Sequence, residues 1–251
     1  LAISLAAGVV VAAPTAESAV KVLHLANGEW PPYTGANLPG HGCDSQLVSE
    51  AFALAGIRVR YSFLPWARGM LLSKNGMVDG TIEWGDLPEY RRTHFISSQP
   101  LSRQQWVFFH RQDIEPDWRQ LEGLRRLRIG LIIGYAYSDV FKTMRVQYPA
   151  TFSEAASDVL NFKKLLNRRI DLFPMERAVG HYLLTTNFTA EQRAGVVFDP
   201  KPIAGFSPHL LLSRAVAGNE QVMQFFEQGV RQLHSSGRYR QIMAPCSPEG
   251  P

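Results

Sequence analysis

The sequence predicts an α/β protein made of two clusters of parallel βαβ units. Short runs rich in Val, Ile, Leu and aromatic residues alternate with stretches that have apolar residues at helical spacing, which is typical of strands joined by crossover helices. The alternation occurs twice, and the two clusters join near 102–106 and 201–207. A chain of 251 residues, 45% hydrophobic and 19% charged, can bury one sizeable core or two smaller ones.

In the first cluster, strands are expected over 22–26, 59–63 and 78–84. Asp44 is expected to N-cap the first helix, and Gly56 to end it. The apolar side of this helix is predicted to hold Leu47, Val48, Ala51, Phe52 and Leu54. A second helix is expected over 66–74, stopped by Gly76, and the β-prone stretch 105–110 closes the unit.

The second cluster begins with an Ile- and Leu-rich strand over 127–133. Ser138 is expected to open a helix, and further helices are predicted over 155–166 and 178–185. Additional strands are expected over 170–174 and 196–199, and the apolar run 209–213 follows before the last helix. The last helix is predicted from the spacing of Val222, Phe225, Phe226, Val230 and Leu233.

The first nineteen residues are expected to be the remainder of a secretory signal. The apolar run 1–13 is too short to span a bilayer but fits the central part of a signal peptide. Neither an initiator Met nor a basic segment precedes it, so the sequence is expected to begin inside the signal. Cleavage is expected near 16–19, with Ala16 at −3 and Ser18 at −1 as one choice. The alternative is a buried N-terminal helix.

Cysteine content and charge exclude some classes. The chain has two cysteines, Cys43 and Cys246, and in an oxidising compartment two cysteines are more often bridged than free. The alternative is two unpaired, small hydrophobic side chains.

The net charge is +4, and the short basic runs 125–128 and 168–169 lack the interleaved aromatics of a protein that binds single-stranded nucleic acid. Nucleic acid is therefore not expected as a partner.

The segment 65–101 carries the strongest functional signal. It starts with Pro-Trp-Ala-Arg at 65–68 and reaches the basic pair Arg91-Arg92. Trp66 can supply a rigid apolar wall, and the guanidinium of Arg91 can bind a carboxylate through two parallel hydrogen bonds. An aromatic face and a fixed positive charge at the ends of neighbouring strands suit a small polar ligand.

Taken together, these residues resemble the periplasmic solute-binding proteins of family 3, the polar-amino-acid type. The resemblance covers roughly 21–245. It rests on Trp-Pro-Pro-Tyr at 30–33, Pro-Trp-Ala-Arg at 65–68, Gly-Met-Val-Asp-Gly at 76–80, Arg91 with Ser-Gln-Pro-Leu at 98–101, Gly-Tyr-Ala-Tyr-Ser at 134–138 and Arg-Ile-Asp-Leu-Phe at 169–173.

The resemblance implies a type II periplasmic-binding-protein fold. Two α/β lobes, with parallel or mixed sheets flanked by helices, would be joined by two hinge strands and would trap the ligand in the cleft between them. Lobe 1 would comprise 20–104 and 203–251, and lobe 2 would comprise 105–202. Cys43 and Cys246 would then lie in the same lobe, which favours the bridge.

The resemblance also implies roles for residues of lobe 1. Trp30 and Trp66 match aromatic walls of the ligand site, and the alternative is that both belong to the lobe core. Arg91 matches the arginine that clamps the ligand's α-carboxylate, and the alternative is a surface ion pair. Arg68 could add a second positive group or lie along its helix.

In lobe 2, Tyr135 and Ser138 fall at a helix N-terminus, where free N–H groups favour an anion. Glu176 matches the acid that receives the ligand's ammonium group in many members. The alternative for Glu176 is a glutamate at a helix N-terminus without ligand contact.

The sequence departs from the amino-acid-binding pattern at Trp84-Gly85-Asp86, where members usually have a small residue and a Ser or Thr. Asp86 could pair with Arg91 and partly neutralise it, and Trp84 would narrow the pocket. A ligand carboxylate beside Asp86 would be repelled by about 1–4 kcal/mol in an intermediate dielectric. Either Asp86 points away from the ligand, or the ligand is not a simple α-amino acid.

Three functions are compatible with these residues. The leading one is periplasmic capture of an amino acid or related carboxylate by a monomer without metal or cofactor, and its delivery to an inner-membrane permease of the ABC type. The second is ligand sensing with a membrane receptor as partner. The third is a prephenate- or arogenate-type dehydratase on the same fold. The sequence has no HExxH, GxSxG or Walker A motif, and its seven histidines are scattered, which disfavours an enzyme.

Overall fold

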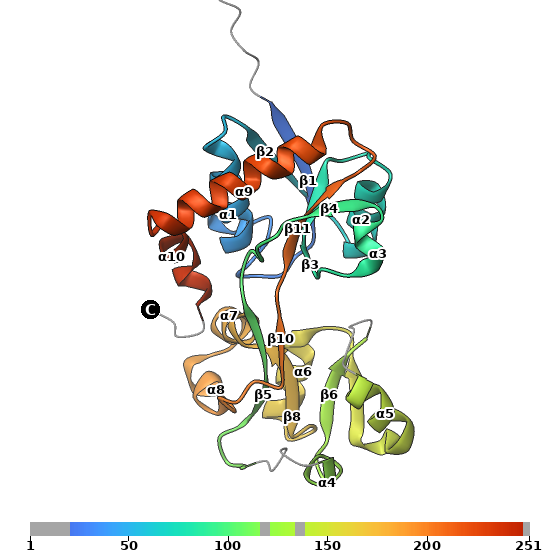
Figure 1. The fold of residues 1–251 in the computed structure, drawn as a ribbon. Coiled ribbons are helices and arrows are strands. Elements are labelled where there is room, and N and C mark those ends of the chain that lie inside the picture. Colours follow the sequence, from blue (N-terminus) through green and yellow to red (C-terminus); the bar gives the residue numbers. More distant parts are fainter. Residues whose placement is uncertain (1–20, 116–120, 134–138, 248–251) are drawn as a thin grey trace, which may run out of the picture.

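The structure is a computed structural model that describes residues 21–115, 121–133 and 139–247. It has two α/β lobes, each built on its own sheet flanked by helices (Figure 1). The two ends of the described chain, blue to cyan and red in Figure 1, share one lobe, and the middle of the chain forms the other. The predicted two-lobed α/β class is thus confirmed. The expected signal remainder, 1–19, lies outside the described residues.

The sheet of lobe 1 has the strand order β2-β1-β3-β11-β4. β1 runs parallel to β2 and β3, whereas β11 is antiparallel to β3 and β4. The sheet is therefore mixed, with a late strand inserted between two early ones. Its strands are β1 (Val22–Asn27), β2 (Arg58–Phe63), β3 (Gly80–Trp84), β4 (His94–Ile96) and β11 (His209–Ser213).

The helices of lobe 1 pack closely on one another and on the sheet. α1 and α9 cross where a Cβ on Gly229 would lie 2.2 Å from the backbone oxygen of Ala51, so the contact requires glycine. Phe52 and Phe226 meet beside this crossing, with ring centroids 5.4 Å apart. The helices are α1 (Cys43–Ala53), α2 (Trp66–Lys74), α3 (Pro88–Arg91), α9 (Asn219–Ser235) and α10 (Arg238–Met243), with 3-10 turns at Pro39–His41 and Ala244–Cys246.

A disulfide joins the two cysteines. Cys43 at the start of α1 is bonded to Cys246, their Cα atoms are 6.4 Å apart, and both residues are buried. The bridge spans 203 positions of sequence and ties the end of the described chain to α1. The predicted pairing is confirmed.

The sheet of lobe 2 has the order β10-β5-β8-β6-β7, and β9 also pairs with β5. β6 is parallel to β7 and β8, whereas β5 is antiparallel to β8, β9 and β10. The strands are β5 (Gln104–Arg111), β6 (Ile129–Ile132), β7 (Phe152–Ala155), β8 (Leu172–Glu176), β9 (Val196–Phe198) and β10 (Ala204–Phe206).

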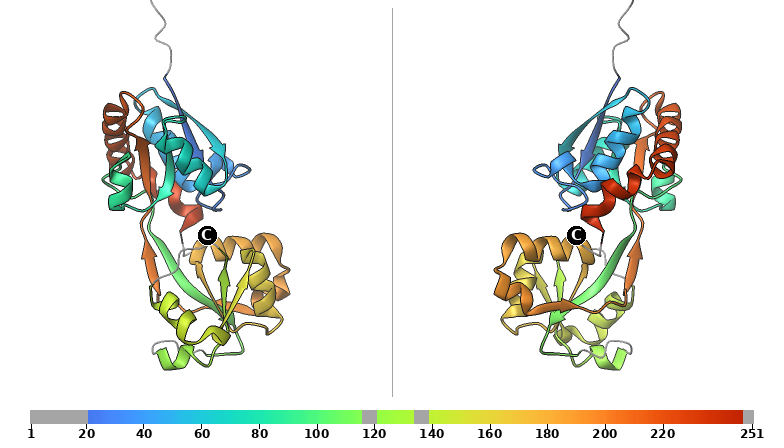
Figure 2. Two further views of the ribbon diagram at one scale, coloured as in Figure 1. Left: turned by 90° about the vertical axis from the view of Figure 1, so that its right-hand side faces the viewer. Right: turned by 90° about the vertical axis from the view of Figure 1, so that its left-hand side faces the viewer.

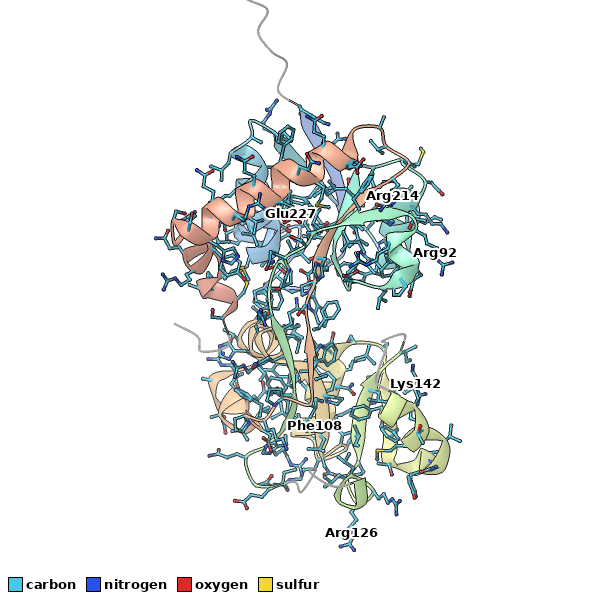
Figure 3. All side chains as sticks on the ribbon, in the orientation of Figure 1. Arg92, Phe108, Arg126, Lys142, Arg214 and Glu227 are labelled. Carbon is cyan, nitrogen blue, oxygen red and sulfur yellow. A yellow bond between two sulfur atoms is a disulfide. The ribbon has the colours of Figure 1, made fainter. Side chains whose placement is uncertain are left out.

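Side-chain caps begin several helices of lobe 2. Ser157 accepts a hydrogen bond from the backbone N–H of Leu160 at the start of α6, and Thr189 forms a capping box with Gln192 at the start of α8. These bonds satisfy donors that the helix itself cannot. Phe108, labelled in Figure 3, is buried in the core of this lobe. The helices are α4 (Leu121–Leu124), α5 (Asp139–Gln147), α6 (Asp158–Leu166), α7 (Arg177–Asn187) and α8 (Ala190–Ala194), with a 3-10 turn at Pro149–Thr151.

Two neighbouring segments cross between the lobes (Figure 2). One leads into β5, and the other runs from β10 into β11. They lie side by side, because the N–H of Leu101 donates to the backbone oxygen of Pro208 at 2.7 Å and Gln104 pairs with Phe206. β5 and β10 pair at the edge of the second sheet, and the predicted division of the chain at 104 and 203 stays a prediction.

The structure differs from several local expectations. α1 begins at Cys43 after Gly42, and Asp44 does not cap it; the carboxylate of Asp44 instead accepts from Ser102. The helix expected from 155 begins at 158, because 152–155 forms β7. The short strands β4, β7 and β10 were not expected. Leu54 and Phe225, expected on apolar helix faces, are exposed.

Candidate functional site

The carboxyl ends of the parallel strands of lobe 1 bring three tryptophans to one edge. Trp30 follows β1, Trp66 follows β2 as the first residue of α2, and Trp84 ends β3. β1 pairs with β2 on one side and β3 on the other, which makes the β1–β3 boundary a topological switch point. Open α/β sheets bind ligands outside the carboxyl ends of strands at such a point.

The carboxyl ends of the parallel strands of lobe 2 face this edge of lobe 1. β6 lies between β7 and β8 with both neighbours parallel to it, and β8 ends at Glu176. The hydroxyl of Tyr33, after β1, donates to Glu176 Oε1 at 3.2 Å. This bond connects the carboxyl ends of the two sheets directly.

Trp30 lies at this junction. Its indole ring stacks on that of Trp106 with centroids 6.2 Å apart, and its Nε1 donates to Gln104 Oε1 at 3.3 Å. Trp30 is half-buried and packs against the apolar core. The structure therefore combines the two readings of Trp30, as part of the core and as a side chain at the interlobe edge.

Trp66 and Trp84 form an aromatic surface with Tyr90. The ring of Trp84 meets that of Trp66 edge-on, with centroids 5.9 Å apart, and meets that of Tyr90 in the same way at 5.5 Å. Trp66 lies directly on Gly28, where an added Cβ would come within 2.1 Å of the indole. All three rings are partly exposed, so they offer an apolar wall to a small molecule.

Arg91 and Asp86 form an ion pair beside this wall. The side chains are 63% and 32% exposed, so solvent screens the pair and its net energy is small. The sequence anticipated this pairing as one of its alternatives. Arg68 is exposed, and its backbone N–H donates to the oxygen of Pro65 at 2.9 Å. Arg92 is exposed on the outer flank of lobe 1 (Figure 3).

Glu176 is the N-cap of α7. Its Oε2 accepts from the N–H of Val179 at 2.8 Å, and its Oε1 accepts from the N–H of Gln105 and from Tyr33. The carboxyl group is buried, and burial raises its pKa although these bonds oppose the shift. This arrangement matches the alternative of a glutamate at a helix N-terminus, and both oxygens already have donors. Contact with a ligand ammonium stays a prediction.

Tyr135 and Ser138 lie outside the described residues, between β6 and α5. The segment that contains them follows the carboxyl end of β6, the central parallel strand of lobe 2. Their predicted contribution to an anion site stays a prediction.

The structure adds two acids that the sequence did not single out. Glu83 is buried in β3 with a backbone φ of 69°, and its Oε2 accepts from Gln104 Nε2 at 2.8 Å. A non-glycine residue in this left-handed region is strained and such residues cluster at functional sites. Asp44 is fully buried next to it. The sequence signal that could have pointed to Glu83 is a charged residue within the otherwise β-prone run 80–84.

Other kinds of site find no support in the described part of the chain. It holds no cluster of three or more His, Cys, Asp or Glu side chains that could bind a metal ion. In the same residues, every helix is too short or too polar to cross a membrane. A cavity of about 570 Å³ beside the end of β5 contains none of the predicted site residues; it is lined by Arg111, Gln112, Asp113, Leu166, Arg168 and Gly195.

Comparisons with known proteins agree with this fold. No protein-family model matches the chain, and no curated protein matches its sequence. The probable amino-acid ABC transporter extracellular-binding protein ytmK from Bacillus subtilis has a TM-score of 0.73 and 10% identity over 89% of this chain and 96% of its own. An ancestral arginine-binding protein bound to arginine has a TM-score of 0.67 and 16% identity, with coverage of 88% and 96%.

A histidine kinase sensor domain with similarity to periplasmic binding proteins has a TM-score of 0.67 and 18% identity, with coverage of 88% and 94%. At such identities the likeness shows the fold alone. The chain has the two-lobed fold of periplasmic binding proteins.

Proposed function

We propose that this protein is a periplasmic solute-binding protein of the polar-amino-acid type. It captures a small polar solute, an amino acid or a related carboxylate, between its lobes. The observation that carries the proposal is the bond between Tyr33 and Glu176, because it joins the two lobes at the edges where the parallel strands of each sheet have their carboxyl ends. The solved structures of like fold include amino-acid-binding proteins, which supports this choice of ligand class.

The side chains at this edge suit such a ligand. Trp66 and Trp84 offer an apolar wall, and Arg91 offers a guanidinium that can hold a carboxylate by two hydrogen bonds. Asp86 occupies Arg91 in this structure. Because the Arg91 side chain is largely exposed and solvent screens the pair, exchanging the carboxylate of Asp86 for that of a ligand costs little. Arg68 is a second cation for the same purpose.

Binding is proposed to proceed by closure of the lobes about the two crossing segments. A ligand that contacts both lobes shifts the population towards the closed form by its differential affinity for that form. The protein would act as a monomer in the periplasm and deliver its ligand to an inner-membrane permease. No step of this cycle requires a cofactor or bond chemistry, so we propose binding without catalysis.

A second candidate is sensing. The likeness to a histidine kinase sensor domain supports a role in which the closed form contacts a membrane receptor instead of a permease. Ligand capture is the same in both cases. The two functions differ only in the membrane partner that binds the closed form.

The test is thermal stabilisation by a panel of amino acids and small organic acids. A ligand present at about 100 times its Kd is expected to stabilise the fold by about 2.7 kcal/mol. Arg91→Ala should abolish the shift, whereas the matched control Arg92→Ala should retain it. A panel without any shift, or a shift that Arg91→Ala leaves intact, would count against the proposal.

A further inference from the structure

Two buried carboxyl groups meet at the base of the crossing strand β5. Asp44 on α1 is fully buried and Glu83 on β3 is 8% exposed. Asp44 Oδ2 accepts from the hydroxyl of Ser102 at 2.8 Å, and Glu83 Oε2 accepts from Gln104 Nε2 at 2.8 Å. Each carboxyl group also lies close enough to the other to perturb it electrostatically, and each has one buried oxygen without a hydrogen-bond partner.

A hydrogen bond between the two acids would require a proton. An ionised carboxylate only accepts hydrogen bonds, so two carboxylates cannot bond to each other, whereas a carboxyl group can donate to a carboxylate. The other oxygens, Asp44 Oδ1 and Glu83 Oε1, are buried and have no donor if both groups are ionised. One proton placed between them satisfies both atoms, as a single negative charge shared by two close carboxyl groups does in other proteins.

The surroundings favour keeping this proton. The titratable groups that act on the pair or are acted on by it are Glu176 from β8, Tyr33 after β1, Tyr61 from β2 and Tyr239 from α10. All of them are acids. Burial raises the pKa of Asp44, and burial together with Asp44 raises the pKa of Glu83 well above its usual range.

Two further ionisable side chains lie close in the sequence or the sheet but face elsewhere. Arg103, between Ser102 and Gln104, is exposed. His209, paired with Trp84 on β11, has its Nδ1 2.8 Å from the backbone oxygen of Ser97. Neither supplies a counter-charge to the pair.

The acid pair holds the start of the crossing strand. Ser102 and Gln104 are the residues that enter β5, and each is bonded to one member of the pair. Gln104 also accepts from Trp30 Nε1 through its Oε1. The amide of Gln104 is therefore fixed at both ends, by Glu83 on one side and by a tryptophan of the candidate site on the other.

We propose that Asp44 and Glu83 share one proton, and that this proton holds the base of β5 and the indole of Trp30 in place. When the proton leaves to solvent, two carboxylates face each other without a donor, and their repulsion loosens the strand on which the lobes move. The protein thus carries a pH-sensitive element at its hinge, whatever ligand it binds.

The sign of the effect follows from the raised pKa of the pair. The folded protein holds one more proton than the unfolded chain at pH values between the unfolded and the folded pKa. The stabilisation is complete below the unfolded values, about 3.9 for Asp and 4.3 for Glu, and is lost as the pH rises through the folded value. Within that window the unfolding equilibrium constant should rise about tenfold per pH unit from this source.

The variants Glu83→Gln and Asp44→Asn test the proton directly. Each replaces one acid with an amide of the same shape whose NH₂ donates to the remaining carboxylate, so the bond persists without a titrating proton. Urea unfolding of wild type, followed upwards in pH from the unfolded carboxyl values, should show the tenfold-per-unit rise, and both variants should lack it. Glu50→Gln is the matched control on the same helix as Asp44: Glu50 pairs with Arg238, which lowers its pKa, so the pH slope of this variant in this range should equal that of wild type.

The hinge part of the proposal has its own measurement. Amide hydrogen exchange of the segment 101–107, corrected for the intrinsic pH dependence, should accelerate with pH in wild type and stay constant in Glu83→Gln. If the unfolding free energies of wild type and both variants changed with pH in the same way, the shared proton would be overturned. If the corrected exchange rate of 101–107 in wild type were the same at all pH values, the effect of the proton on the hinge would be overturned.

If either variant fails to fold, infrared spectroscopy of wild type decides. The carbonyl band of a protonated carboxyl group should persist in the folded protein at pH values above the unfolded carboxyl pKa and vanish on unfolding, and its absence would overturn the proposal. None of these measurements uses a ligand, so their outcome is independent of the outcome of the thermal-shift panel.

Discussion

The hydroxyl of Tyr33 donates to the carboxyl group of Glu176 at 3.2 Å, and this bond links the loop after β1 in lobe 1 to the end of β8 in lobe 2. Glu176 also caps α7 and accepts from the backbone of Gln105. One buried carboxylate therefore joins a loop of lobe 1, a helix of lobe 2 and a crossing strand. Removing any of its donors should affect the relation between the lobes.

Tyr33→Phe removes this interlobe bond and keeps the ring in place. Because hydrogen bonds to charged groups are worth about 1.5–3 kcal/mol, we expect a loss of unfolding free energy of that order in urea titrations. The radius of gyration in solution should also rise, because one restraint on lobe separation is gone. Tyr239→Phe is the control: its hydroxyl bonds to the backbone of Leu101 within lobe 1, so it should lower stability without changing the radius. A Tyr33→Phe protein with wild-type stability and size would contradict this account.

Reduction of the disulfide should destabilise the protein. The bridge from Cys43 to Cys246 closes a long stretch of chain, and loss of a native disulfide typically costs about 2–5 kcal/mol. Urea unfolding with and without reductant measures this, and the Cys43→Ser, Cys246→Ser double variant should match the reduced wild type. An unchanged unfolding midpoint in reductant would refute the prediction.

Gly229→Ala should weaken the contact between α1 and α9. The new Cβ would lie 2.2 Å from the backbone oxygen of Ala51, so the helices must move apart, at a cost of about 1–3 kcal/mol. Gly205→Ala is a suitable comparison, because the nearest atom to its new Cβ is 3.9 Å away. Thermal unfolding of both variants checks the difference. Equal melting temperatures would show that the crossing tolerates a side chain.

The ion pair between Asp171 and Arg128 should contribute stability that is lost in acid. Arg128 lowers the pKa of Asp171 to about 2, below its value in the unfolded chain. The contribution is therefore present above the unfolded pKa, about 3.9, and disappears as the pH falls towards 2. Allowing for solvent screening, Asp171→Asn should cost about 1–2 kcal/mol at neutral pH and nothing at the acid end. A cost that is the same at both pH values would contradict this assignment.

Much of the fold was predictable because apolar spacing is a local signal. The helical spacing of Val222, Phe226 and Val230 predicted α9, and Trp66 after a strand predicted an aromatic face at the strand ends. The strands β4 and β10 have three residues each, too few for a periodic pattern, and they exist because longer neighbours pair with them. The likeness to one family also supplied the two-lobed arrangement, which local patterns cannot give.

The acids of the site were harder to interpret. Asp44 occupies the first turn of a helix, where an acid ordinarily acts as a cap, and only the packing of β3 and β5 against α1 shows that it faces Glu83 instead. The sequence left two roles for Glu176, a ligand contact and a position at a helix N-terminus. Two of its three hydrogen-bond donors, Tyr33 and Gln105, are far away in the sequence, and the third, Val179, is three residues further on. Such roles depend on side-chain direction, which sequence spacing does not determine.

The central claim, that a solute is held between closing lobes, is tested most directly by small-angle X-ray scattering with the compound from the panel that stabilises the protein most. The account predicts that this compound lowers the radius of gyration of wild type and leaves that of Arg91→Ala unchanged. A compound that binds tightly without any change in the radius of wild type would contradict closure around the ligand.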